Sequence, residues 1–394
     1  MAEALILLVV LPPALLWLAC CGATALSVRR LGRLSDVHLS RTRWPKLSVI
    51  TPACNEGAEI EPALRSLLGQ AYPALEVVAV DDRSTDDTGE IIDRLAIEDP
   101  RLIPVHVTSL PPGWLGKLNA LAEGVKRAQG DWLLFTDADV QFDPHALERA
   151  IELAEEQQLD LLTAVPELTS TGFLLDVCFN AAGAFACAAG RVWQVPDPKS
   201  SAVAGIGAFI LVRRSAYDRS PGIEWLKLEV ADDVGMGLLI KSHGGRCAVV
   251  SGVGQMRLAW YASVRDMNAK MQKNWFAIIG HFSVARLLGI ALLFVWLACY
   301  PALLLLMRPE LGGAGWAAVL VSCLGVLAAI GSSMLYARWT RRPYLPSLFV
   351  GAGMLLLAAM MLSAARSGQR AGGISWRGVL YPSALLRDAQ RVRL

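Results

Sequence analysis

The chain has 394 residues, of which 54% are hydrophobic and 18% are charged. This composition is too apolar for a protein that is soluble throughout and too polar for one that lies in a membrane throughout, and it excludes a disordered chain, a collagen-like chain and a small disulfide scaffold. The net charge of +2 gives no reason to expect a nucleic-acid partner. We therefore expect a soluble domain joined to several membrane spans.

The first apolar segment, residues 4–28, contains no charged side chain and is long enough to cross a bilayer core of about 30 Å. A cleaved signal peptide would begin with basic residues, whereas the only early charge here is Glu3. We therefore interpret residues 1–28 as an uncleaved transmembrane anchor. Six basic residues follow between Arg29 and Lys46, and the positive-inside rule places this flank in the cytoplasm.

Three more apolar segments predict three C-terminal transmembrane helices within residues 287–365, followed by a basic tail, 366–394. The expected location is the cytoplasmic (inner) membrane, with several spans and the soluble domain facing the cytoplasm. Four spans would place the basic tail outside, against the positive-inside rule. Either one segment is re-entrant or interfacial, or the earlier spans override the charge bias.

The polar middle of the chain, residues 46–280, has short apolar runs that alternate with amphipathic stretches. The runs that predict strands are 47–50, 75–80, 102–107 and 132–135. Helices are predicted over 60–70 and 115–129, and another begins near Thr85–Thr88. This alternation predicts an α/β fold with a mainly parallel, Rossmann-like sheet covered on both faces.

Polar clusters follow three of these strands: Asn55 and Glu56 after the first, Asp81 and Asp82 after the second, and 137–139 after the fourth. In open parallel sheets, ligands bind at the carboxyl ends of the strands. We therefore expect the candidate site at this edge of the sheet.

Asp137 and Asp139 are two residues apart, so in extended backbone their side chains point to the same face. Two neighbouring carboxylates repel unless a cation joins them, and hard oxygen ligands suit Mg²⁺ or Mn²⁺ with phosphate oxygens and water. An isolated Asp-x-Asp is more commonly a solvated turn. Its position beside two other polar strand ends favours a metal site.

The other polar residues have two interpretations each. Asp81 and Asp82 are suited to accept hydrogen bonds from a base or ribose, or to cap the next helix. Lys117, in the segment Pro112–Lys117, is suited to reach a diphosphate, or is an ordinary residue of a first helical turn.

The segment 47–140 resembles the nucleotide-binding half of a family 2 glycosyltransferase with the GT-A fold. The sequence motifs that match are Val49–Glu56, Val80–Thr88 and Gly130–Val140. Together with the membrane spans, the chain is similar to the ceramide-glucosyltransferase-like branch. The words Pro112–Lys117 and Trp376–Gly378 are more similar to bacterial hopanoid-biosynthesis-associated and carotenoid glycosyltransferases.

The resemblance implies a UDP-sugar donor, a divalent metal and inversion at the anomeric carbon. It makes Asp82 the nucleotide-contacting carboxylate, Asp139 the principal metal ligand and Asp137 a second ligand. The residues that it implies for binding the nucleotide sugar are Pro52, Asn55, Glu56, Asp81, Asp82, Lys117 and Asp137.

The family also has a later acidic pair that opens a helix, and Asp232 and Asp233 fit it, with Asp232 in place of the usual Glu. By resemblance Asp233 is the general base for the acceptor hydroxyl, although an acidic pair alone is more commonly a helix cap. Many membrane relatives carry a Gln/Arg-x-x-Arg-Trp motif after the base. The segment 271–275 has the Trp of this motif but neither of its two expected polar partners. Lys273 and Trp275 either contact diphosphate and sugar or belong to an interfacial helix.

Segments 172–192 and 258–281 are apolar but interrupted by charges, which favours interfacial helices near a lipid acceptor. Residues 203–212, with Gly205 and Gly207, predict a strand under the acceptor pocket. The leading hypothesis is a membrane-bound, metal-dependent inverting glycosyltransferase that acts on a lipid hydroxyl. The alternatives are a processive polysaccharide synthase and a non-catalytic nucleotide-sugar-binding membrane protein.

Overall fold

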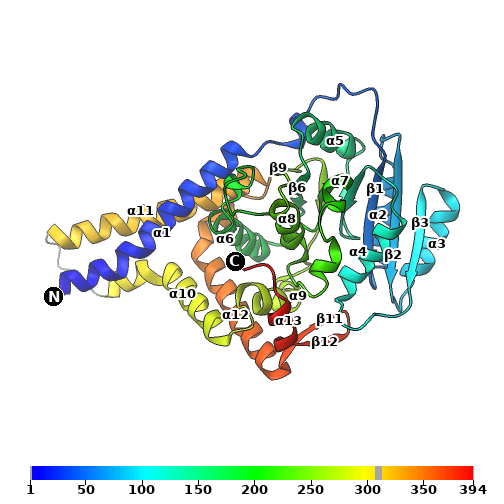
Figure 1. Cartoon of the computed structure of the whole chain (residues 1–394). Coiled ribbons are helices and arrows are strands. Elements are labelled where there is room, and N and C mark those ends of the chain that lie inside the picture. The colour runs from blue at the N-terminus through cyan, green and yellow to red at the C-terminus, as the bar shows by residue number, and fades with distance from the viewer. Residues whose placement is uncertain (1, 307–312, 394) are drawn as a thin grey trace. The chain divides into compact units, whose positions relative to one another are not determined.

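The computed structural model describes residues 2–306 and 313–393 (Figure 1). The chain forms two compact units. An α/β unit is built from Leu31–Thr169, Gln194–Ala259 and Ser375–Leu394, and a helical unit from Met1–Arg30, Ser170–Trp193 and Trp260–Ile374. The chain therefore passes back and forth between the two units.

The α/β unit contains a seven-stranded sheet in the order β3-β2-β1-β4-β8-β6-β9. Its strands are β1 (Leu47–Ala53), β2 (Leu75–Asp82), β3 (Leu102–Val107), β4 (Trp132–Phe135), β6 (Leu161–Val165), β8 (Ile210–Arg213) and β9 (Cys247–Ser251). Only β8 runs antiparallel to its neighbours, β4 and β6. The mixed α/β fold with a mainly parallel sheet confirms the prediction from sequence.

Helices connect the strands and cover the sheet. They are α2 (Ile60–Leu68), α3 (Thr88–Glu98), α4 (Gly116–Arg127), α5 (Ala146–Glu156), α7 (Arg214–Asp218) and α8 (Asp232–Ser242). In α2, for example, Ile60, Leu64 and Leu67 recur at helical spacing and are buried. A small second sheet joins β5 (Gln141–Phe142), β10 (Met256–Leu258) and β7 (Glu167–Leu168).

Strand β1 is buried along its whole length, as a strand covered on both faces should be. It continues through Pro52, beyond the predicted end at Ile50. Its pairing with β4 stops at Ile50, whereas its pairing with β2 continues to Ala53. Pro52 therefore lies where the ladder to β4 has already ended, and a residue without an N–H group is tolerated there.

The predicted strand 203–212 is shorter than expected, because β8 begins only at Ile210. The preceding residues form a loop that packs tightly on α8. A Cβ atom on Gly205 would lie 1.7 Å from the carbonyl oxygen of Asp233, and one on Gly207 would lie 2.8 Å from Asp137 Oδ2. The two glycines therefore allow this loop to approach the candidate site, and do not mark a strand.

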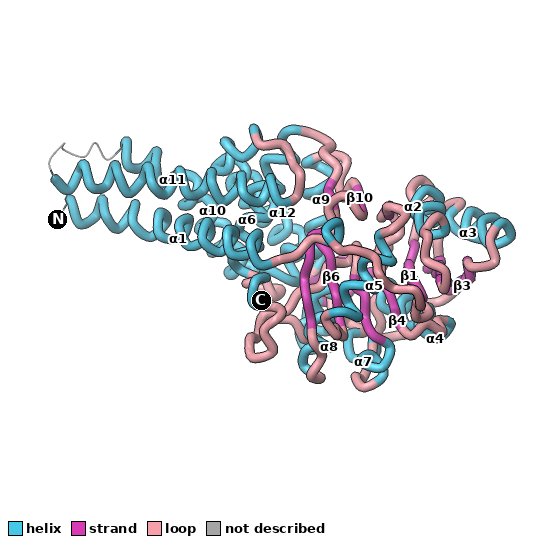
Figure 2. Tube along the Cα trace, turned by 90° about the horizontal axis from the view of Figure 1, so that it is seen from above, coloured by secondary structure: helices cyan, strands magenta, loops and turns pink. Residues whose placement is uncertain are grey.

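The helical unit consists of helices, most of them long and apolar. Its helices are α1 (Ala2–Arg30), α6 (Phe173–Ala189), the short polar α9 (Val264–Asn274), a π-helical turn (Trp275–Ile279), α10 (Val284–Leu306), α11 (Gly313–Trp339) and α12 (Val350–Ala371). Helices α1 and α11 lie side by side (Figure 2). Five helices are long and apolar enough to cross a membrane: α1, α6, α10, α11 and α12. The fifth candidate, α6, falls in the segment expected to be interfacial.

Within the helical unit, α6 carries a charged group that is almost entirely shielded from solvent. Asp176 forms an ion pair with Arg342, and these side chains are 3% and 1% exposed. The Arg342 guanidinium also lies 4.5 Å from the centre of the Phe179 ring. The amide of Asn180 donates to Ser347 Oγ at 3.0 Å. Polar contacts therefore join α6 to the segment before α12.

The segment expected to be a basic tail, 366–394, is folded. Helix α12 continues through Ala371, and β11 (Gly373–Trp376), β12 (Val379–Pro382) and α13 (Ser383–Ala389) follow. The first of the three C-terminal spans is predicted over residues 287–307, and its last residue, Met307, lies outside the described residues.

Candidate active site

The segment after β4 carries Asp137 and Asp139. Asp139 Oδ1 is shielded from solvent and has no hydrogen-bond partner among the described residues. Burial, reinforced by the carboxylates of Asp137 and Glu56, raises the pKa of Asp139 to about 7. A carboxylate oxygen in this state is stabilised by any cation that reaches it.

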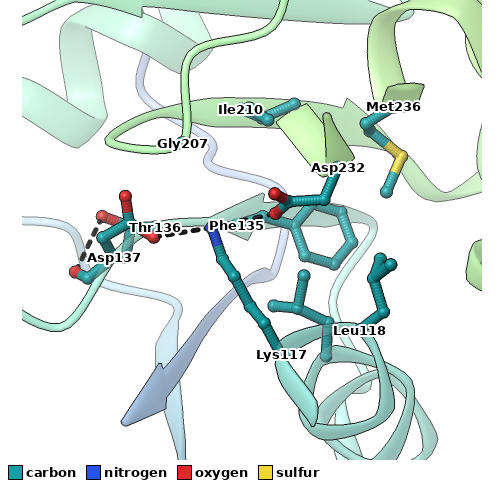
Figure 3. Close-up of a pocket in the computed structure, with 10 residues that line it drawn as sticks. Lys117, Leu118, Phe135, Thr136, Asp137, Gly207, Ile210, Asp232 and Met236 are labelled. Atoms are coloured by element: carbon teal, nitrogen blue, oxygen red, sulfur yellow. Dashed lines mark hydrogen bonds and ion pairs between the residues drawn. The ribbon is translucent and has the colours of Figure 1, made fainter. Parts of the chain in front are cut away.

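Lys117 lies in the first turn of α4 and joins two acidic segments. Its Nζ is 2.9 Å from Asp137 Oδ1 and 2.8 Å from Asp232 Oδ2. Figure 3 shows the ammonium group between these carboxylates, in a pocket that Gly207 and Met236 also line. Burial opposes the charge of Lys117, but the two carboxylates outweigh it and raise the pKa well above its usual value. Lys117, which the sequence suggested for contact with a diphosphate, thus forms ion pairs with two other predicted site residues.

Asp232 and Asp233 are the first residues of α8, as the acidic pair predicts. Asp233 Oδ1 accepts a hydrogen bond from the N–H of Val234 at 2.7 Å. Burial and the neighbouring Asp232 raise the pKa of Asp233 to about 6. A carboxylate with a pKa near 6 is ionised at neutral pH and is a stronger base than an ordinary aspartate.

Asp82, at the end of β2, is fully buried and held by two arginines. Arg83 Nε donates to Asp82 Oδ1 at 2.7 Å, and Arg377 Nη1 donates to Asp82 Oδ2, also at 2.7 Å. Burial alone would raise the pKa of Asp82, but these hydrogen bonds lower it below its usual value. Arg83 adopts a positive φ of 57°, which brings its side chain back onto the preceding residue.

The neighbouring Asp81 has different partners. Its Oδ1 accepts from the N–H of Ser84 at 3.2 Å, and its Oδ2 lies 3.2 Å from His106 Nδ1. The other nitrogen of His106 lies 2.9 Å from Asp93, and this carboxylate, followed by Asp81, raises the pKa of the imidazole. Asp81 therefore helps to fix the turn after β2 against β3.

The segment after β1 is tied to the segment after β2. Asn55, with a positive φ of 57°, accepts from the N–H of Thr85 at 2.8 Å. The N–H of Glu56 donates to Thr88 Oγ1 at 2.8 Å, and the carbonyl of Pro52 accepts from Arg377 at 3.4 Å. All three predicted residues thus lie at the same sheet edge as Asp81 and Asp82.

The predicted contacts Lys273 and Trp275 belong to the helical unit, in α9 and the π-helical turn. Trp275 is 8% exposed, and its indole Nε1 is buried without a hydrogen-bond partner among the described residues. Their roles remain predictions. Conversely, Arg83, His106 and Arg377 contact predicted site residues but were not predicted. Arg83 and Arg377 both lie inside sequence motifs on which the family resemblance rests, and these motifs could have indicated the two arginines as site residues.

A divalent cation fits the residues present. In the described part of the chain no three His, Cys, Asp or Glu side chains are grouped to enclose a metal. A Mg²⁺ or Mn²⁺ ion that binds through one or two carboxylates and takes its other ligands from phosphate and water needs no such group. The unpartnered Oδ1 of Asp139 provides one hard oxygen, and Asp137 lies two residues away.

The α/β unit, a mainly parallel sheet with carboxylates at its strand ends, has a GT-A-like fold. Residues 48–175 match the family model described as glycosyl transferase family 2. A solved structure with the same fold is a mannosyltransferase from Pyrobaculum calidifontis in complex with GDP-Man and Mn²⁺. The two are 21% identical with a TM-score of 0.50, over 92% of this chain and 99% of that one.

Curated relatives match the same region of the sequence. One is a putative teichuronic acid biosynthesis glycosyltransferase, TuaG, of Bacillus subtilis, 36% identical over 29% of this chain and 45% of its own length. Another is a GalNAc(5)-diNAcBac-PP-undecaprenol beta-1,3-glucosyltransferase of Campylobacter jejuni, 32% identical over 28% of this chain and 35% of its own length. The chain thus spans less than half the length of these relatives.

Proposed function

We propose that this chain is a membrane-bound, metal-dependent, inverting glycosyltransferase. In this proposal it moves a sugar from a nucleotide sugar, UDP-linked by the resemblance above, to the hydroxyl group of a lipid-type acceptor. The observation that carries the proposal is the Lys117 bridge, which joins Asp137 of the Asp-x-Asp segment and Asp232 of the acidic pair in one pocket. A metal ligand and a base are the two functions that displacement of a nucleoside diphosphate requires.

Asp233 is the proposed general base. Its carboxylate takes the proton of the acceptor hydroxyl as the oxygen attacks the anomeric carbon. The new bond forms between acceptor oxygen and anomeric carbon, while the bond between that carbon and the diphosphate oxygen breaks. The electron pair leaves with the nucleoside diphosphate. Attack opposite the leaving group inverts the anomeric configuration.

Asp139, with Asp137, would hold the divalent cation. When bound, the cation supplies charge neutralisation to the departing diphosphate. Lys117 keeps Asp137 and Asp232 in place, and the loop with Gly205 and Gly207 limits the space around Asp233. The turn of Asn55 and Glu56, with Asp81 and Asp82, forms the proposed nucleotide end of the site.

Two observations support a lipid acceptor. Five helices are long and apolar enough to cross a membrane, so the chain has extensive surface suited to lipid. The relative from Campylobacter jejuni is named for an undecaprenol-linked substrate. We extend these to a cytoplasmic-membrane location with the α/β unit facing the cytoplasm. A ceramide-like or hopanoid-like acceptor is suggested only by the resemblance in sequence.

The test is reconstitution of the full chain in vesicles that contain a bacterial lipid extract. Labelled UDP-sugars and GDP-mannose are supplied with Mg²⁺ or Mn²⁺. We expect a monoglycosylated product that extracts into organic solvent and is lost on chelation of the metal. Asp139→Asn and Asp233→Asn should each lower the rate by about 10²- to 10⁴-fold.

Asp218→Asn is the matched control, because Asp218 is an exposed aspartate of the same unit at the end of α7. It should retain full activity. A water-soluble polymer as product would indicate a polysaccharide synthase. Binding of nucleotide without any product from any donor would indicate a non-catalytic nucleotide-sugar-binding protein.

A further inference from the structure

The segment after α12 folds onto the α/β unit as a strap around the candidate site. We define this C-terminal strap as residues 375–393. Its hairpin turns at Arg377 and Gly378, which have φ angles of 48° and 76°. Two successive residues with positive φ are the signature of the tight hairpin turn that matches the twist of paired strands. The turn holds the Arg377 side chain at a fixed position.

The strap is anchored at three places. Arg377 donates to Asp82 at the end of β2 and to the carbonyl of Pro52 at the end of β1. The hydroxyl of Tyr381 donates to the carbonyl of Trp114, in the loop before α4, at 3.3 Å.

The third anchor lies next to the acidic pair. The N–H groups of Arg391 and Val392 donate to Glu229 Oε2 at 2.6 and 3.0 Å. The other oxygen of Glu229 accepts from the N–H of Ala231, directly before Asp232. The strap thus contacts three segments: the strand ends at the nucleotide end of the site, the loop before the helix of Lys117, and the segment before the proposed base.

Asp82 has more hydrogen-bond donors around it than its two oxygens need. Its carboxylate is fully buried and is contacted by two guanidinium groups, Arg83 and Arg377. Elsewhere the site is acidic, and Lys117 is already shared by two carboxylates. A guanidinium has five N–H donors, and the bonds to Asp82 and Pro52 leave donors of Arg377 for a ligand. An anion is the partner that such a corner stabilises.

Space at this corner is tightly restricted. A Cβ atom on Gly116 would lie 2.6 Å from Arg83 Nη2, 2.7 Å from Asp82 Oδ2 and 3.6 Å from Arg377 Cδ. The first residue of α4 therefore packs directly against the Asp82 cluster. The N-terminus of a helix, with its unpaired N–H groups, adds to the attraction for an anion.

We propose that Arg377 of the C-terminal strap binds the diphosphate of the donor, with Asp82 acting as a positioning residue that holds its guanidinium. This inference rests on the proposed function and deepens it. It assigns the remaining N–H donors of Arg377 at the nucleotide end to the anionic part of the donor. It also makes the far C-terminus a part of the donor site.

The test measures binding of UDP, GDP and the matching nucleosides to the full chain in detergent with Mn²⁺. Arg377→Gln should raise the Kd of the bound nucleoside diphosphate by about 10- to 100-fold and that of its nucleoside by less than about threefold. Arg377→Lys keeps the charge but loses the planar fork, so its Kd should lie between those of the native chain and Arg377→Gln. Arg393→Gln, an exposed arginine of the same strap, is the matched control and should leave both values unchanged.

The outcomes separate the two proposals. Native binding of a nucleoside diphosphate that Arg377→Gln leaves unchanged would overturn the inference alone, as would equal weakening of diphosphate and nucleoside. Absence of binding to the native chain would overturn the proposed function and, with it, this inference. If Arg377→Gln does not fold, Arg377→Lys provides the test. A native Kd for the nucleoside diphosphate would overturn the proposal. A Kd that is raised for the nucleoside diphosphate but not for the nucleoside would support it.

Discussion

The ammonium group of Lys117 lies 2.8 Å from a carboxylate oxygen of Asp232, although the two residues belong to different helices. The same nitrogen contacts Asp137, so one cation joins the start of α4, the end of β4 and the start of α8. This arrangement fixes the position of the acidic pair relative to the Asp-x-Asp segment. Catalysis by positioning requires such a fixed arrangement.

Lys117→Met should reduce both stability and activity, because it leaves two neighbouring carboxylates without their shared cation. We expect a loss of about 3 kcal/mol in the free energy of unfolding, the low end of the range for a broken buried pair, since the lysine side chain is 15% exposed. Thermal melting in detergent and the transfer rate measure the two effects. Lys126→Met, on the same helix but 67% exposed, should change neither. A native melting temperature for Lys117→Met would contradict the structural role.

The pH dependence of transfer should report Asp233. The pKa of its carboxyl is about 6, and only the ionised form accepts a proton, so kcat/KM should fall about tenfold per pH unit below pH 6 and level off above it. The profile is measured from pH 5 to 8 at saturating metal. Asp218→Asn should reproduce the native profile. A rate that stays constant down to pH 5 would exclude Asp233 as the base.

Gly205→Ala should impair the rate more than donor binding. The added methyl group would meet the backbone oxygen of Asp233 at 1.7 Å, so either the loop or the start of α8 has to move. A displacement of about 1 Å at a catalytic group costs on the order of 10²-fold in rate. Gly32→Ala, where a Cβ would meet nothing within 4 Å, is the control. An unchanged kcat for Gly205→Ala would show that Asp233 does not need this close contact.

Removing one partner of the Asp176–Arg342 ion pair should destabilise the helical unit more than removing both. Arg342→Gln alone leaves a buried carboxylate without its partner and should destabilise the helical unit by about 3–5 kcal/mol. The double variant Asp176→Asn with Arg342→Gln should lose less than this single variant, because no unpaired charge remains. Melting temperatures of the single and double variants in one detergent provide the comparison. A double variant less stable than Arg342→Gln would contradict this account.

Much of the α/β unit follows from local sequence. The runs that become β3 and β4 begin and end where their apolar residues do, and the carboxylates after the strands meet because parallel strands end at one sheet edge. The helix that begins at Asp232 was likewise predictable, since acidic residues stabilise a helix N-terminus. Patterns of neighbouring residues are sufficient for features of this kind.

The contacts that complete the site are not local. Arg377 and Asp82 are separated by 295 positions, and no periodicity in either segment indicates that they meet. The ion pairs of Lys117 likewise join α4 to Asp137 and to Asp232, far along the chain, and sequence patterns do not specify these contacts. Gly205 and Gly207 allow a loop to pack closely against another backbone segment. In sequence, glycines with this role look the same as glycines within a weak strand, and the pattern therefore predicts a strand.

The order in which the chain visits its two units constrains its passage through a bilayer. Strands β6 and β8 share one sheet, so helix α6, which lies between them in sequence, begins and ends on the same side of any membrane. The chain likewise leaves the α/β unit after Ala259 and rejoins it at Ser375. If the α/β unit lies wholly on one side of a membrane, the complete crossings in between are even in number, and α10, α11 and α12 would not each cross once. The arginines after α12 would then lie on the same side as those after α1, as the positive-inside rule expects.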